Sequence, residues 1–256
     1  MTILELYKEL DARWPRTLSC SWDNDGLMFC PDPEREVKRV MLALDATRAS
    51  IAAAADANCD LLLTHHPMLF RGVKSLSPLD LSGSRIFDAW NGGVSVISLH
   101  TRLDTGDGGV NDALAEALGL HILGKFGDEE TPELGRIVET EAPAEPVDFA
   151  SRVRKALGCP VVQLSGDRPV RRVALVGGDG KDFIRAAAAA GADTLITGAA
   201  SYNTALDAAE DGLNIIEAGH YYTEAPVLAK LAELCRALCG AECVMYDSNL
   251  TRTVTE

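Results

Sequence analysis

Residues 40–64 read VMLALDATRASIAAAADANCDLLLT, and residues 173–197 read VALVGGDGKDFIRAAAAAGADTLIT. Each segment has an apolar run, an alanine-rich stretch and a second apolar run that ends in threonine, an order that predicts strand, helix and strand. The segments align without gaps, and ten of 25 positions are identical, including Asp60/Asp193 and Thr64/Thr197. Two related βα halves are the simplest explanation of this repeat.

The repeat continues beyond the second strand. Residues 88–104, DAWNGGVSVISLHTRLD, resemble residues 207–224, DAAEDGLNIIEAGHYYTE, with a one-residue difference in length. Both end in His-x-x-x-carboxylate, which matches His100 and Asp104 with His220 and Glu224. We therefore predict an α/β fold in which duplicated βα halves form two related mixed-sheet α/β/α domains.

The domain boundaries follow from the repeat. The first half is expected to cover residues 1–124 and to be completed by residues 245–256, and the second half to cover residues 125–244. Residues 127–149, GDEETPELGRIVETEAPAEPVDF, are rich in acidic residues and proline. We interpret them as the crossing between the halves.

Charge and hydropathy narrow the class of protein. The formal net charge of −14 argues against nucleic acid or an anionic membrane as the main partner and leaves a small-molecule substrate. No window has the 18 apolar residues of a membrane span, and residues 1–15 fit an amphipathic helix ending before Pro15 rather than a signal peptide. A cytoplasmic location is expected.

The cysteines do not form a disulfide pattern. There are seven, an odd and scattered set that is typical of reduced thiols. Cys235, Cys239 and Cys243 are evenly spaced and raise the alternative of a metal cluster. We favour buried thiols, because the first two lie in a helical pattern that Gly240 is expected to end.

The candidate site lies where the predicted strands end. His65 and His66 follow DLLLT, His100 and Asp104 follow VSVIS, and His220 and Glu224 follow the matching strand of the second half. Ligands in open α/β sheets collect beyond the carboxyl ends of the strands. A single strand-end histidine is more often structural, but an adjacent pair followed by Pro67 is better explained by two neighbouring metal centres.

Imidazole nitrogens and carboxylates suit zinc, iron or manganese. A carboxylate can bridge two such ions about 3.5–4 Å apart, as in two-metal hydrolases. Two other motifs have a structural and a functional interpretation. The glycines of VALVGGDGKDF fit a tight turn better than a phosphate cradle, and CSWDNDG fits a solvated turn, although Trp22 is a candidate for a pocket rim.

The motifs together resemble one family, the Nif-three-like dinuclear-metal hexameric proteins, which are also described as GTP cyclohydrolase I type II homologues. The resemblance covers nearly the whole chain and rests on SWDNDGLMF, DLLLTHHPMLF, SLHTRLDTGDGGVNDALAEALGL, ADTLITG and AGHYYTE, in that order. It implies two divalent metal ions (Zn, Fe or Mn) held by His65, His66, Asp104, His220 and Glu224. It also implies a position for His100 beside the metals, for which we expect a supporting or proton-transfer role.

The resemblance also implies a duplicated α/β fold and a toroidal homohexamer. The chain departs from the family pattern at Ala199 and Asn203, where glutamate and histidine are common, and at Asp25, where a small apolar residue is frequent. The leading hypothesis is a hydrolase whose metal-bound hydroxide attacks a nucleotide or another small phosphorylated or cyclic-amide substrate, as in a GTP cyclohydrolase. The alternative is a non-catalytic metal-binding or partner-binding hexameric protein.

Overall fold

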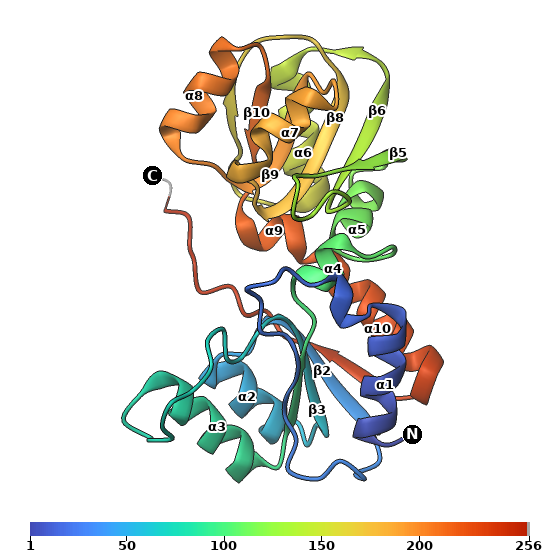
Figure 1. The fold of residues 1–256 in the computed structure, drawn as a ribbon, viewed down its shortest axis with the longest axis vertical. Helices are drawn as coiled ribbons and strands as arrows, with labels where there is room; N and C mark the ends of the chain where they lie inside the picture. Colours follow the sequence, from blue (N-terminus) through green and yellow to red (C-terminus); the bar gives the residue numbers. More distant parts are fainter. Residues whose placement is uncertain (255–256) are drawn as a thin grey trace. The chain divides into compact units, whose positions relative to one another are not determined.

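The computed structural model describes residues 1–254, which form two compact α/β units (Figure 1). The first unit comprises Met1–Leu103 and Leu228–Leu250, and the second consists mainly of Asp104–Val227. Each unit has its own sheet and its own hydrophobic core, as the duplicated sequence predicts. The predicted fold class is confirmed.

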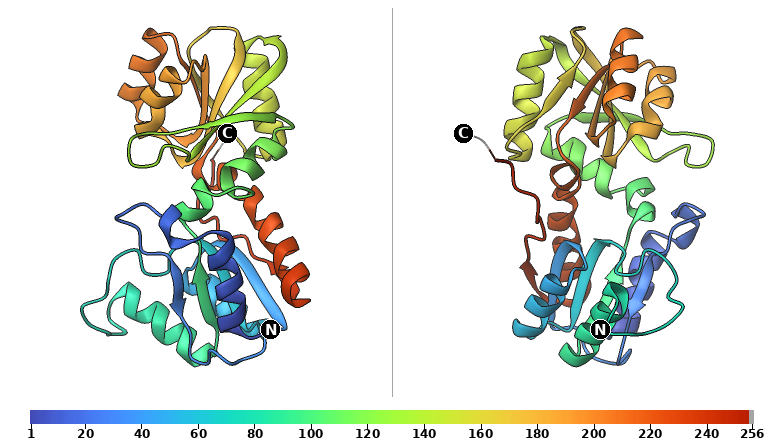
Figure 2. Two further views of the ribbon diagram at one scale, coloured as in Figure 1. Left: turned by 45° about the vertical axis from the view of Figure 1, so that its right-hand side comes forward. Right: turned by 90° about the vertical axis from the view of Figure 1, so that its left-hand side faces the viewer.

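The sheet of the first unit has five strands in the order β1-β4-β3-β2-β11. Only β1 is antiparallel to its neighbour. Helices α2 and α3 cover one face, and α1 and α10 cover the other (Figures 1 and 2). The strands are β1 (Gly26–Phe29), β2 (Arg39–Asp45), β3 (Leu61–His66), β4 (Ser95–Ser98) and β11 (Glu242–Met245). The helices are α1 (Ile3–Arg13), the 3-10 helix η1 (Arg16–Leu18), α2 (Arg48–Asp56), α3 (Leu81–Gly92) and α10 (Pro226–Cys239).

The sheet of the second unit has six strands in the order β5-β6-β8-β9-β10-β7, of which β8, β9 and β10 are parallel. Helices α5 and α6 pack on one face, and α7 and α8 pack on the other. The strands are β5 (His121–Phe126), β6 (Gly135–Ala144), β7 (Gln163–Ser165), β8 (Val170–Asp179), β9 (Thr194–Ala199) and β10 (Asn214–Glu217). The helices are α5 (Val110–Ala117), α6 (Pro146–Leu157), the 3-10 helix η2 (Lys181–Phe183), α7 (Ile184–Ala189), α8 (Tyr202–Glu210) and α9 (His220–Glu224), and α4 (Thr101–Thr105) lies at the boundary between the units.

The internal repeat is visible in equivalent hydrogen bonds. The Asp60 carboxylate accepts hydrogen bonds of 2.8 and 2.9 Å from the backbone N–H groups of Lys38 and Arg39. The Asp193 carboxylate accepts the equivalent bonds, of 2.9 and 2.7 Å, from Arg171 and Arg172. Each aspartate thus fixes the start of one strand to the start of the next, which explains why the repeat retains it.

The boundary between the units differs from the expected one. It lies at Leu103/Asp104 and not at residue 124, because β5 pairs with β6 in the second sheet and α5 packs on that sheet. The interpretation of residues 127–149 as a crossing is wrong, since they contain β6, which pairs with β5 and β8. The first unit is completed by Leu228–Leu250 rather than by residues 245–256, of which 255–256 lie outside the described residues.

The match of His100 with His220 is shifted by one residue in the structure. After the β4 strand, the N–H of Leu99 donates to the Thr64 carbonyl, and the N–H of Ala218 makes the equivalent bond to Thr197, both at 2.9 Å. By count, His100 therefore corresponds to Gly219, and His220 is the first residue of α9. The repeat preserves the strand ends but not the positions of the polar residues that follow them.

The terminal helices agree with the sequence pattern. The helix α1 ends at Arg13, and its Thr2–Glu5 capping box fixes the start. The helix α10 ends at Cys239, after which Gly240 takes a left-handed conformation. Cys235 is buried, whereas Cys239 and Cys243 are only partly buried, so the interpretation as buried thiols is confirmed for Cys235 alone.

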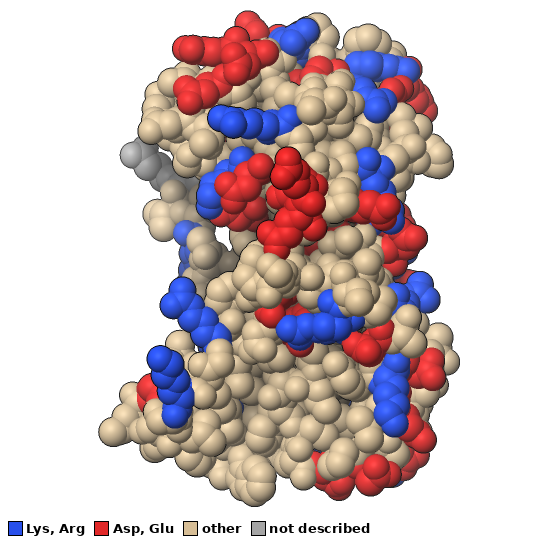
Figure 3. Space-filling model, in the orientation of Figure 1, with Lys and Arg blue, Asp and Glu red and all other residues tan. Residues whose placement is uncertain are grey.

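No helix among residues 1–254 is both long and apolar enough to cross a lipid bilayer. On the face shown in Figure 3, basic side chains are scattered among acidic ones and do not form a continuous basic patch.

Candidate metal site

Three of the predicted site histidines lie together in the first unit. His65 and His66 are the last residues of β3, and His100 follows the adjacent parallel strand β4. The ring centroid of His65 lies 4.9 Å from that of His66 and 5.2 Å from that of His100. The centroids of His66 and His100 are 5.7 Å apart. Each offers one ring nitrogen to a group whose donor atoms all lie within 4.8 Å of one another. The carboxyl ends of two neighbouring strands thus bring the three rings together.

Each of these histidines is oriented through its Nδ1 atom. His65 Nδ1 lies 2.9 Å from the backbone oxygen of Leu99, and because a carbonyl only accepts, Nδ1 must carry the proton. His66 Nδ1 lies 2.8 Å from Asp45 Oδ1, and His100 Nδ1 lies 2.9 Å from Asp23 Oδ1. In a neutral imidazole this leaves the Nε2 lone pair available as a ligand. Metal-binding histidines are typically held in this way.

Asp23 is a buried part of this arrangement and not a residue of a solvated turn, so that interpretation of CSWDNDG is wrong. Its carboxylate also accepts hydrogen bonds from the Thr101 N–H at 3.1 Å and the Thr101 hydroxyl at 2.5 Å. Burial alone would raise the pKa of Asp23, but the hydrogen bonds from His100 and Thr101 and the charge of His100 lower it to about 2. Asp23 therefore stays ionised and keeps the proton on His100 Nδ1 at neutral pH.

Asp25 is buried because it pairs with a buried arginine. Arg102 has no exposed surface, and its Nε and Nη2 atoms each donate to one oxygen of Asp25 at 2.9 Å. Arg102 also donates to Asp11 at 2.6 Å and to the Trp14 carbonyl at 3.1 Å, which joins α1 to the segment after β4. A carboxylate in place of a small apolar residue is thus compensated by a bidentate ion pair.

The remaining predicted ligands, Asp104, His220 and Glu224, belong to the second unit. His220 and Glu224 lie one turn apart on α9, and His220 Nε2 is 3.1 Å from Glu224 Oε1. The backbone oxygen of Asp104 accepts a hydrogen bond from the Asn111 side chain at 3.1 Å, and Asn111 in turn accepts one from the Gly177 N–H. The buried Asn111 therefore connects the end of α4, α5 and the end of β8.

The glycines of VALVGGDGKDF allow α9 to pack closely on β8. At Gly178, where φ is +68°, a Cβ atom would lie 2.3 Å from Glu224 Oε1. The Gly178 N–H donates to the Thr223 hydroxyl at 3.1 Å. Gly198, at the end of β9, would place a Cβ atom 2.6 Å from the His220 Cα. The close packing expected of this motif is confirmed, but Gly177 and Gly178 lie within β8 itself and not in a turn after it.

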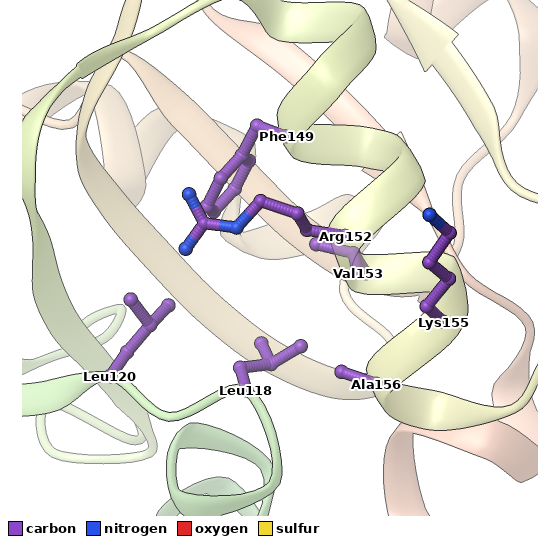
Figure 4. A pocket seen from close by; sticks show the side chains of 7 residues that line it. All are labelled: Leu118, Leu120, Phe149, Arg152, Val153, Lys155 and Ala156. Carbon is purple, nitrogen blue, oxygen red and sulfur yellow. The ribbon is translucent and has the colours of Figure 1, made fainter.

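The second unit has a cavity of about 370 Å³, separate from these ligands (Figure 4). At the edge of the cavity, the Arg152 guanidinium lies over the Phe149 ring. The side chains around it are Leu118, Leu120, Phe149, Arg152, Val153, Lys155 and Ala156. This cavity includes none of the predicted site residues.

The donor chemistry fits a metal ion. Histidine nitrogens and carboxylate oxygens together suit zinc, iron and manganese. The residues of these groups are the predicted His65, His66, His100, Asp104, His220 and Glu224. Sequence reasoning missed Asp45 as a partner of His66, although its position at the end of β2 was a usable signal. It also missed the partnership of Asp23 with His100, which joins residues 77 positions apart.

Comparisons with known proteins show what the chain is similar to. The sequence model of the family described as Duf34/NIF3 (NGG1p interacting factor 3) matches residues 1–250. A Clostridium perfringens protein named GTP cyclohydrolase 1 type 2 homolog is 35% identical over 224 residues, which cover 86% of this chain and 85% of that protein. A Clostridium acetobutylicum protein with the same name is 33% identical over 225 residues, which cover 86% and 84%. The crystal structure of Staphylococcus aureus protein SA1388 is similar with a TM-score of 0.88 at 26% identity and covers 99% of each chain.

Proposed function

Because the chain belongs to the Duf34/NIF3 family, we propose that it is a metal-dependent hydrolase acting on a nucleotide or another small phosphorylated or cyclic-amide substrate. The observation that carries the proposal is the orientation of His65, His66 and His100, each of which points its Nδ1 atom at an oxygen acceptor. Such anchoring fixes the orientation of each ring and leaves its Nε2 atom as the nitrogen available to a metal ion.

The proposed ligands are His65, His66, Asp104, His220 and Glu224, which would hold two divalent ions. His100 is then a neighbour of the ions. Bound ions of this kind polarise the substrate and supply a nucleophile derived from water.

The protein's own residues have distinct tasks in this proposal. Asp45 and the Leu99 carbonyl fix the rings of His66 and His65, and Asp23 fixes the ring of His100. His100 Nε2 can then accept a proton from the attacking water or return one to the leaving group. The names of the two Clostridium relatives make GTP the first substrate to test.

The proposal extends to assembly and location. We expect a cytoplasmic homo-oligomer, in the form of a hexamer, because the sequence resembles a family of hexameric proteins. Iron, zinc and manganese all suit the mixed nitrogen and oxygen ligands.

Metal content tests the ligand assignment. Protein loaded with Zn²⁺ and analysed for zinc should contain two ions per chain, and the His65→Ala and Glu224→Ala variants should lose at least one of them. His121→Ala is the matched control, because His121 is an exposed histidine on the edge strand β5 and its variant should keep both ions. One ion per chain in the wild type would contradict the dinuclear assignment.

Hydrolysis assays test the proposed activity. The metal-loaded protein should hydrolyse a member of a panel of nucleotides, phosphoesters and cyclic amides, and Glu224→Ala should abolish turnover while the oligomer persists. A protein that holds two ions but turns over nothing in this panel would favour the second candidate, a non-catalytic metal-binding or partner-binding protein.

A further inference from the structure

Two large aromatic side chains next to the histidines of the first unit are exposed to solvent. Trp22 is 55% exposed and Phe70 is 50% exposed, and their ring centroids lie 5.9 Å apart at an interplanar angle of 48°. Trp22 lies in the loop between η1 and β1, and Phe70 lies in the loop after β3. Adjoining apolar side chains on a surface commonly mark a binding site.

The two loops are held to each other and to the histidine cluster. The Asn24 side chain donates a 2.5 Å hydrogen bond to the Leu69 carbonyl, which joins the residues beside the two rings. The Cys20 N–H donates to the Thr101 hydroxyl at 2.9 Å, and Asp23 bonds His100 and Thr101. The loops that carry the two rings are therefore held to each other, which reduces the entropic cost of binding.

The pair adjoins the proposed chemistry through His100. The His100 ring centroid lies 6.0 Å from that of Trp22 and 6.2 Å from that of Phe70, in edge-on arrangements. The same ring lies 5.2 Å from His65 and 5.7 Å from His66. Only the ring of His100 thus separates a group bound on Trp22 and Phe70 from His65 and His66.

We propose that Trp22 and Phe70 form a subsite that binds the flat heteroaromatic ring of the substrate by stacking. This inference rests on the proposed function and adds a substrate class and a recognition mode to it. Flat rings stack on aromatic side chains in an offset arrangement, and stacking of this kind tolerates different bases because each has a π-face. The subsite therefore takes adenine and guanine nucleotides alike.

Binding measurements on the metal-loaded full chain test the subsite. Calorimetry with GTP, with ATP and with inorganic tripolyphosphate separates the contribution of the ring from that of the phosphates. Trp22→Ala and Phe70→Ala should each weaken GTP and ATP binding roughly tenfold. Their affinity for tripolyphosphate and their metal content should not change, and Trp22→Tyr should restore most of the nucleotide affinity.

Trp90→Ala is the matched control. Trp90 lies on α3, is 62% exposed and makes an edge-on contact with Phe29 of β1, so it is a similarly exposed tryptophan of the same unit. Its removal should leave all three affinities unchanged.

Three results would overturn the subsite while leaving the metal proposal intact. The first is a wild-type protein that holds two ions but binds neither nucleotide more tightly than tripolyphosphate. The second is a Trp22→Ala, Phe70→Ala double variant with wild-type nucleotide affinity. The third is an equal loss of affinity for nucleotides and tripolyphosphate in the variants, which would assign the rings a structural role. Failure of the proposed function has a different signature, namely wild-type protein without bound metal.

Discussion

The ends of β3 and β9 show how one framework serves two purposes. Both strands follow an anchoring aspartate, and both contain a threonine near the end. The Thr64 hydroxyl donates to the His66 carbonyl, and the Thr197 hydroxyl donates to the Gly178 carbonyl of β8. In the first unit the next two residues are His65 and His66, whose rings face His100. In the second unit they are Gly198 and Ala199, and Gly198 lies against the backbone of α9.

The difference shows what each half gained after duplication. A side chain at position 198 would collide with the Gly178 carbonyl and the His220 Cα, at 2.5 and 2.6 Å. The second unit therefore carries its polar residues on α9, and the close approach of α9 to β9 requires glycine. In the first unit, the equivalent positions at the end of β3 hold two imidazoles instead.

A histidine at position 198, the counterpart of His65, should disrupt the packing of β9 against α9. Gly198→His forces a large side chain into backbone atoms, and we expect a loss of about 3 kcal/mol in the free energy of unfolding. Urea unfolding of the full chain, followed by circular dichroism, measures this loss.

The matched control is Ala199→His, which introduces the same side chain at the next, partly exposed position. It should cost less than about 1 kcal/mol. Equal stability of the two variants would contradict the packing account of the difference between the halves.

Substitution of the two anchoring aspartates tests whether both halves depend on the same hydrogen bonds at the start of their strands. Asp60→Ala and Asp193→Ala each remove the acceptor of two backbone N–H groups, and each should cost about 2 kcal/mol of stability. The measurement is again urea unfolding, and Asp56→Ala, at an exposed position on α2, should change stability by less than about 0.5 kcal/mol. A large cost in one half and none in the other would mean that the halves no longer share this anchor.

The sequence was sufficient to predict the elements that repeat. The apolar runs that end in Thr64 and Thr197 predicted strands, and ligands collect beyond the carboxyl ends of the strands in open α/β sheets. This placed His65, His66 and His100 correctly with one another. The same reasoning failed at β6, where the acidic residues and prolines of 127–149 obscured a strand that pairs with β5 and β8.

The partners of the site residues were beyond the reach of the sequence. The Asp25–Arg102 and Asp23–His100 pairs each join positions 77 apart, and the choice of partner depends on how the loop before β1 reaches the end of β4. The one-residue offset between His100 and His220 has a similar origin. It depends on where α9 begins after β10, and an alignment of the two halves cannot fix that position.

The Asp23–His100 pair belongs to the first unit alone, because Gly219 takes the position of His100 in the second, and a pH titration can measure its contribution. The pKa of Asp23 is about 2 in the folded protein against an ordinary 3.8, so the carboxylate stabilises the fold above pH 4 and loses this effect as the pH falls through 2. Asp23→Asn keeps the shape but not the charge, and we expect it to cost about 1 kcal/mol at pH 7, after allowance for solvent screening. The difference in unfolding free energy between wild type and variant, measured at pH 7, 5, 4 and 3, should begin to shrink below pH 4. A difference that stays constant down to pH 3 would show that Asp23 acts through shape alone, and that the ionised carboxylate is not what holds the proton on His100 Nδ1.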